Sequence, residues 1–84
     1  GTALYDSINY TVRVFKNSQT KNNILIVLTD GEDTASSLTL SQLQNSLKYA
    51  NAKVYTIGIG NSINEDVLRR IGKYHNATDP STLQ

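Results

Sequence analysis

The stretch ILIVLTDGEDT, residues 24–34, places a run of aliphatic side chains directly before a glycine turn and a group of carboxylates. Residues 24–28 are aliphatic throughout, and the run is too short for a helix, which is typical of a strand buried on both faces in a parallel sheet. Asp30 and Gly31 then predict a turn. The expected buried strand and the candidate chemistry therefore meet at one point in the chain.

Helical patterns lie on both sides of this strand. Residues 3–16 repeat apolar side chains at intervals typical of an amphipathic helix, at Leu4, Ile8, Val12 and Phe15. After the acidic turn, Thr39 and Gln42 have the spacing of a capping box. This box predicts a second helix to about residue 50, with an inward stripe formed by Leu40, Leu43, Leu47 and Ala50.

The remaining sequence continues the alternation. Residues 52–60 predict a buried strand that ends in glycines, and Asn64 predicts the cap of a short helix that ends near Gly72. Tyr74 lies in a weak strand, and residues 79–81 predict a turn that opens another helix. Alternating helices and strands indicate right-handed βαβ units, hence an α/β fold with a parallel sheet and helices on its faces.

Composition limits the classes of function. The 84 residues, 38% of them hydrophobic, predict one small globular unit. Eight basic and seven acidic residues are spread along the chain without a polybasic run, so nucleic acid is not predicted as a partner. No segment has the apolar length of a membrane span. The chain has no cysteine, and the cellular compartment is left undetermined.

The acidic turn has two interpretations. Ligands of parallel sheets gather where the strands end, and the carboxylates of Asp30, Glu32 and Asp33 would suit a hard cation such as Mg²⁺. Zinc is not predicted, since there is no thiolate and the only imidazole, His75, is distant in sequence. Asp-Gly turns are also common and acidic residues stabilise helix N-termini, so the turn alone favours a structural role.

A second feature changes this balance. GTALYDSI (1–8), ILIVLTDGED (24–33) and VYTIGIG (54–60), in this order, resemble the C-terminal half of a von Willebrand factor A-type domain, the vWA or integrin I-like family. The resemblance implies a partial doubly wound, Rossmann-like three-layer sandwich with about three parallel strands flanked by helices. Residues 1–84 would form the C-terminal portion of a single such domain.

The resemblance also implies a metal-ion-dependent adhesion site (MIDAS). In the family an Asp-x-Ser-x-Ser loop, a threonine and an aspartate hold the ion, and by resemblance Thr2 and Asp30 match the last two. Gly31 lets the backbone turn away, while Glu32 and Asp33 are expected to be helix-side charge or a partner-facing rim. The ion would keep an open position for a carboxylate of a partner protein, so the resemblance implies recognition and no catalytic residue.

This chain departs from the family pattern, because it contains no Asp-x-Ser-x-Ser sequence. With Thr2 and Asp30 alone, about four of the six positions around Mg²⁺ would remain water. We therefore expect a longer parent domain to bind Mg²⁺ or another divalent cation, and this fragment to bind it weakly or not at all. In the family, the strand equivalent to residues 24–28 lies beside the first strand, which this chain lacks. The resemblance therefore implies an exposed apolar edge at strand 24–28, through which the fragment could self-associate or swap elements.

Two other functions stay open at this stage. The Asp30 cluster would serve a magnesium-dependent hydrolase or phosphoryl-transfer enzyme, although no nucleophile or phosphate cradle is visible. Alternatively, the chain is a structural fragment with no ligand. The tyrosines are expected to be half-buried packing residues, namely Tyr5, Tyr10, Tyr49, Tyr55 and Tyr74.

Overall fold

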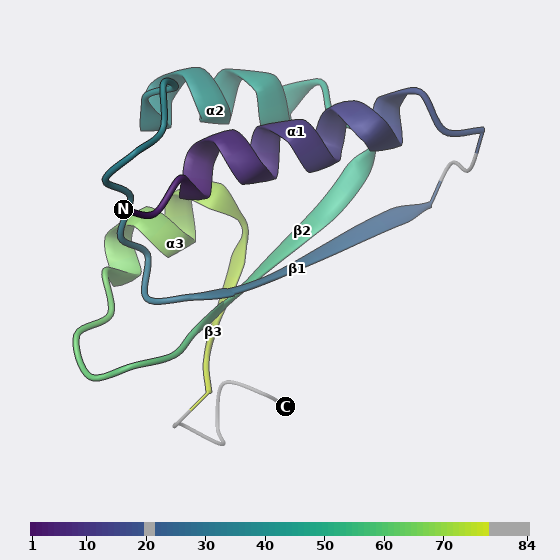
Figure 1. The fold of residues 1–84 in the computed structure, drawn as a ribbon. Helices are drawn as coiled ribbons and strands as arrows, with labels where there is room; N and C mark the ends of the chain where they lie inside the picture. Colours follow the sequence, from purple (N-terminus) through teal and green to yellow (C-terminus); the bar gives the residue numbers. More distant parts are fainter. Residues whose placement is uncertain (20–21, 78–84) are drawn as a thin grey trace.

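The computed structural model describes residues 1–19 and 22–77 (Figure 1). Helices and strands alternate along this part of the chain, as the sequence predicts: α1 (Leu4–Lys16), β1 (Asn23–Thr29), α2 (Leu40–Lys48), β2 (Ala52–Gly58), α3 (Glu65–Ile71) and β3 (Lys73–Asn76). The turn and helix expected at residues 79–81 lie outside the described residues. No helix in the described part is long and apolar enough to cross a bilayer.

The strands form one parallel sheet in the order β1-β2-β3. Asn23 lies opposite Ala52 at one end of the β1–β2 pair, and Thr29 lies opposite Gly58 at the other. The predicted α/β class with parallel strands flanked by helices is confirmed. In the described sheet β1 is an edge strand, as the sequence predicts.

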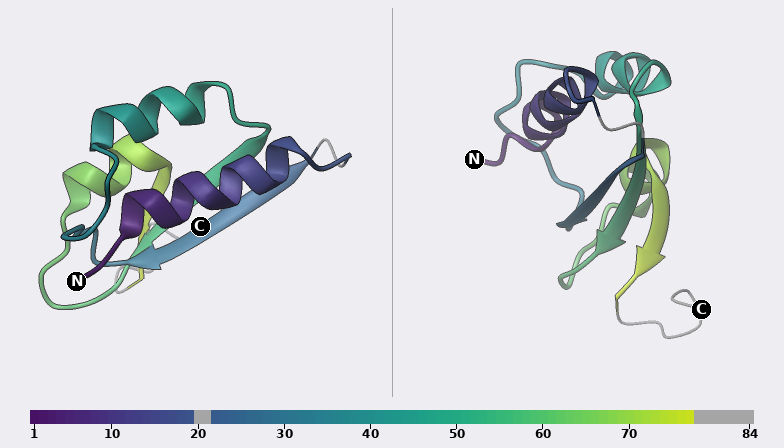
Figure 2. Two further views of the ribbon diagram at one scale, coloured as in Figure 1. Left: turned by 45° about the horizontal axis from the view of Figure 1, so that its top comes forward. Right: turned by 90° about the vertical axis from the view of Figure 1, so that its right-hand side faces the viewer.

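The helices lie over one face of the sheet (Figure 2), so the described residues contain one helical layer and one sheet layer. This arrangement follows from the helical stripes, because the buried side chains of each helix meet in one cluster. Leu25, Val27 and Val54 contribute the strand side of that core. The helices contribute Leu4 and Ile8 from α1, Leu43 from α2, and Val67 and Ile71 from α3.

One expectation for β1 is wrong within the described residues. Residues 24–28 were expected to be covered on both faces, but burial alternates along the strand. Ile24, Ile26 and Leu28 are 58%, 56% and 60% exposed, because their side chains point away from the face that the helices cover. An apolar stripe therefore lies open beside the unpaired edge of the sheet.

The helix ends follow their local sequence signals. Thr39 and Gln42 form the predicted capping box of α2, and the Asn64 side chain accepts a hydrogen bond from the backbone N–H of Val67 at the start of α3. Gly72 ends α3 with extended backbone. A Cβ at Gly72 would lie 2.5 Å from the carbonyl oxygen of Val54, so a close approach of two backbones requires glycine there.

Candidate functional site

Thr2, the first candidate metal ligand, is fastened to the loop that follows β1. The backbone N–H groups of Thr34 and Ala35 both donate to the carbonyl oxygen of Thr2, at 2.8 and 3.0 Å. In return, the N–H of Thr2 donates to the Oγ1 atom of Thr34 at 2.9 Å. Asp30 lies four residues before Thr34 in the same loop, so the structure brings both candidate ligands to the end of the molecule where β1 ends.

Asp33 secures the start of α1. Its carboxylate accepts hydrogen bonds from the N–H of Tyr5 at 2.7 Å, from the N–H of Ser36 at 3.0 Å and from the Ser36 hydroxyl at 2.5 Å. Partial desolvation raises the pKa of Asp33, but these bonds and one from the N–H of Ala35 outweigh it and lower the pKa below its usual value. The expected helix-side role is correct, and the helix concerned is α1.

Asp6 completes a reciprocal arrangement from the helix side. Its carboxylate accepts from the N–H groups of Ser37 and Leu38, at 2.8 and 3.0 Å, while its own N–H donates to the hydroxyl of Ser36 at 2.9 Å. We call these two interlocked segments, residues 2–6 and 33–38, the clasp. Sequence reasoning missed Asp6 and Thr34, because their partners are some thirty residues away along the chain and no local spacing links them.

Asp30 occupies an exposed position where the loops after β1 and β2 meet. Its Oδ1 atom accepts from the N–H of Glu32 at 2.9 Å, and its carbonyl oxygen accepts from the N–H of Asn64 at 2.6 Å. Gly31 turns the backbone with a φ of 89°, as expected from the sequence, and a Cβ there would lie 2.8 Å from the carbonyl oxygen of Asn64. The position of Asp30 therefore depends on the glycine next to it.

The donor chemistry of Thr2 and Asp30 suits a hard cation. Both side chains are exposed at this end of the molecule, and the Thr2 hydroxyl and the Asp30 Oδ2 atom have no hydrogen-bond partner among the described residues. Hydroxyl and carboxylate oxygens are ligands that Mg²⁺ accepts, but two of them fall short of its usual six. Within residues 1–19 and 22–77, no group of three or more His, Asp or Glu side chains converges as a metal site would require.

The acidic cluster is divided by the structure. Asp33 is taken up by α1 and Ser36, whereas Glu32 is exposed and its side chain makes no hydrogen bond or ion pair in the described part of the chain. Tyr5, next to the cluster, has a raised pKa, first because of desolvation and then because Asp33 and Glu32 are negatively charged. The three carboxylates of the quoted stretch thus have three different environments and do not act as one site.

A parallel α/β domain with polar loops gathered where its strands end belongs to the class of folds that bind ligands at that edge. Comparison with known families makes the class specific. The von Willebrand factor type A domain matches residues 1–83, and this chain belongs to that family. The resemblance seen in the three sequence blocks is thereby confirmed.

Among curated proteins, the chain is similar to an uncharacterized protein of Borreliella burgdorferi, with 31% identity over 90 aligned positions. The alignment covers 99% of this chain and 26% of the relative, so the chain spans only about a quarter of that protein's length. No solved structure gave a significant match.

Family membership supports a general recognition role. Von Willebrand factor type A domains are typically protein-interaction or adhesion modules, and they are generally not enzymes. Domains of this family also bind divalent metal ions in general.

Proposed function

We propose that this chain is a protein-binding module in which Thr2 and Asp30 contribute oxygen ligands to a divalent-metal-dependent recognition site. One observation carries the proposal. The clasp fastens Thr2 to the loop that begins at Asp30, by hydrogen bonds in both directions between Thr2 and Thr34. Among the described residues, the Oγ1 atom of Thr2 and the Oδ2 atom of Asp30 accept no hydrogen bond. These are the two oxygens that we assign to the ion.

A divalent cation held there would offer an open coordination position to a carboxylate of a protein partner. The chain's own residues would hold the ligands in place. Thr34 fixes the backbone of Thr2, while Gly31 and the N–H of Glu32 fix the orientation of Asp30. Because two ligands leave most positions of Mg²⁺ to water, we propose that residues 1–84 are the C-terminal portion of a single domain whose other ligands lie elsewhere in a longer parent polypeptide. The relative's greater length is compatible with this.

The alternatives have less support. An enzyme that uses the Asp30 cluster would need carboxylates that act together, but Asp33 is committed to the backbone of α1. A purely structural role accounts well for Asp33 and Asp6, whose oxygens accept hydrogen bonds within the clasp. For Asp30 it accounts for Oδ1, which accepts from the N–H of Glu32, but not for the exposed Oδ2 atom.

The test is thermal unfolding during a MgCl₂ titration, applied to this chain and to any longer polypeptide in which it occurs. A ligand that binds the native state raises the midpoint of unfolding, by an amount that grows with its concentration. We expect a magnesium-dependent rise in the longer polypeptide, loss of that rise in Asp30→Asn, and no loss in the matched variant Glu32→Gln. The chain alone should respond little. Equal magnesium responses of wild type and Asp30→Asn would refute the site.

A further inference from the structure

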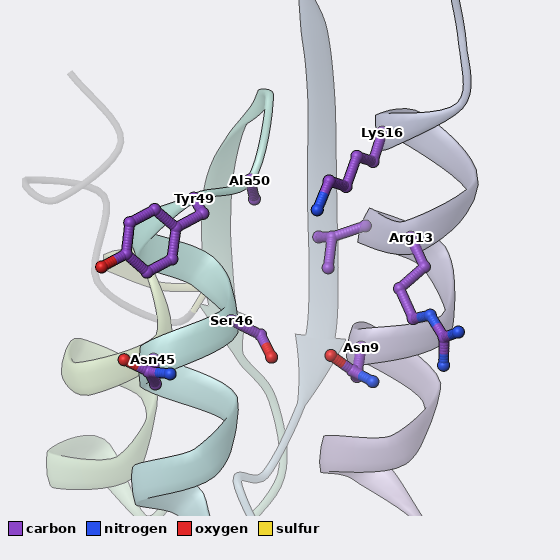
Figure 3. Close-up of a pocket in the computed structure, with 8 residues that line it drawn as sticks. Asn9, Arg13, Lys16, Asn45, Ser46, Tyr49 and Ala50 are labelled. Atoms are coloured by element: carbon purple, nitrogen blue, oxygen red, sulfur yellow. The ribbon is translucent and has the colours of Figure 1, made fainter.

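A groove separates the C-terminal halves of α1 and α2, at the opposite end of α1 from the clasp (Figure 3). Its cavity has a volume of about 400 Å³, and residues from both helices line it. The buried side chain of Val12 lies in the wall contributed by α1. In the close-up, Asn9 of α1 and Ser46 of α2 face one another across the groove, and the amino group of Lys16 reaches back over it.

The groove is electrostatically positive. Arg13 and Lys16 line it, and Lys48 lies in the last turn of α2. None of the described residues that line it is acidic. The ion pairs of the described residues are Glu65–Arg69 and Asp66–Arg70, both within α3. The other described carboxylates lie in the clasp and its loop, so none of them neutralises Arg13 or Lys16.

Uncommitted hydrogen-bonding groups accompany these charges. The side-chain amides of Asn9 and Asn45 and the hydroxyl of Ser46 line the groove and make no hydrogen bonds in the described part of the chain. Tyr49, expected from the sequence to be half-buried, is 74% exposed at the groove. Arg13 and Lys16 lie in the last turn of α1, where a positive charge stabilises a helix through its dipole whichever way the side chain points. This effect alone would explain the two charges. The dipole does not account for the amide of Asn9 and the hydroxyl of Ser46, which two helices present to one another across the groove.

We propose that this groove docks a short acidic segment of a protein partner. The carboxylates of the segment would meet Arg13 and Lys16, and its backbone would exchange hydrogen bonds with the Asn9 amide and the Ser46 hydroxyl. A polypeptide fits better than a nucleic acid, because the formal net charge of the chain is only +1 and it has no basic run to follow a phosphate backbone. This site requires no metal ion and goes beyond the proposed recognition site at the other end of α1.

The probe is a fluorescein-labelled peptide of alternating glutamate and glycine, compared by fluorescence anisotropy with the same peptide carrying glutamine. We expect the glutamate peptide to bind more tightly, and added salt to weaken its binding. The double variant Arg13→Gln/Lys16→Gln should bind it about fivefold more weakly, as expected for two partly exposed charge pairs. The matched control Lys53→Gln/Lys73→Gln removes the same charge from exposed strand residues outside the groove and should bind within about twofold of wild type.

Four outcomes would overturn the proposal. If both double variants bound the glutamate peptide equally more weakly than wild type, the peptide would be attracted by net charge alone. If the glutamate and glutamine peptides bound equally well, or if neither bound detectably, the groove would not recognise carboxylates. Loss of binding after addition of EDTA would place the peptide at a metal ion and away from the groove. Since the groove site predicts no response to EDTA, its failure and that of the Thr2–Asp30 site are distinguishable.

Discussion

The carboxylate of Asp33 accepts a hydrogen bond at 2.7 Å from the backbone N–H of Tyr5, 28 residues earlier in the chain. The first turn of a helix leaves backbone N–H groups without partners, and usually the side chain of the N-cap residue satisfies one of them. At α1 the N-cap is Ala3, whose side chain makes no such bond. Asp33 and the Ser36 hydroxyl supply the missing acceptors for Tyr5 and Asp6, so α1 is capped from a distant loop.

We therefore predict that Asp33→Ala lowers the free energy of unfolding by about 1–2 kcal/mol, the usual effect of losing a helix cap. Glu32→Ala is the matched control, because Glu32 is exposed and its side chain has no partner among the described residues. It should change stability by less than about 0.5 kcal/mol. Urea unfolding followed by circular dichroism measures both, and similar effects of the two changes would contradict the capping role.

Acid should weaken the same contact. The pKa of Asp33 lies below its usual value in the folded chain, so folding favours the ionised carboxylate. Its contribution to stability is then fully present above the unfolded pKa, near 3.8, and is lost as the pH falls through the lower folded pKa. We expect Asp33→Asn to be less sensitive to acid than wild type when thermal unfolding is followed from about pH 5 down to about pH 2. Parallel pH profiles would show that Asp33 does not titrate with folding.

Two glycines with positive φ allow a paired test of crowding at the Asp30 turn. Gly31 and Gly60 have φ of 89° and 113°, which other residues adopt only with strain, and alanine at either position should cost about 1 kcal/mol or more. A Cβ at Gly31 would also meet the Asn64 carbonyl oxygen at 2.8 Å, whereas at Gly60 the nearest atom is 3.7 Å away. We predict that Gly31→Ala is the more destabilising change in chemical denaturation; the reverse order would contradict the crowding.

The open apolar stripe of β1, Ile24, Ile26 and Leu28, should promote self-association of this chain. Exposed apolar side chains beside an unpaired strand edge are a common route to strand pairing between copies. We predict concentration-dependent association in sedimentation velocity, reduced in Ile26→Lys. Val14→Lys on α1 is the control, because Val14 is also half exposed but lies away from the stripe. Association that both variants leave unchanged would exclude the stripe as its cause.

Local signals in the sequence predicted most of the fold. The capping box of Thr39 and Gln42, the cap at Asn64 and the stripe of Leu4, Ile8 and Val12 each depend on residues within a few positions of one another. Such patterns report on the helix that carries them. They predicted the order of the elements, and the alternation of helices and strands predicted the parallel sheet. The family resemblance added the exposed edge at β1.

Long-range contacts explain what the sequence did not predict. Thr34 fastens Thr2 and Asp6 holds the backbone of residues 37–38, but no spacing reveals bonds that span about thirty residues. The aliphatic run at 24–28 identified a strand without revealing that the described helices cover only one of its faces. Tyr10 and Tyr49 were expected to be half-buried, but they are 71% and 74% exposed.

The clasp also has a consequence for the dynamics of the chain. Segments that open locally exchange their amide hydrogens fastest. Here the N–H groups of Tyr5 and Asp6 are bonded to the loop, and those of Thr34 and Ala35 are bonded to Thr2, so neither segment can open without releasing the other. These four amides should exchange with deuterium at similar rates, as one cooperative unit. The local opening of residues 2–6 is thereby coupled to that of residues 33–38 in the loop after β1.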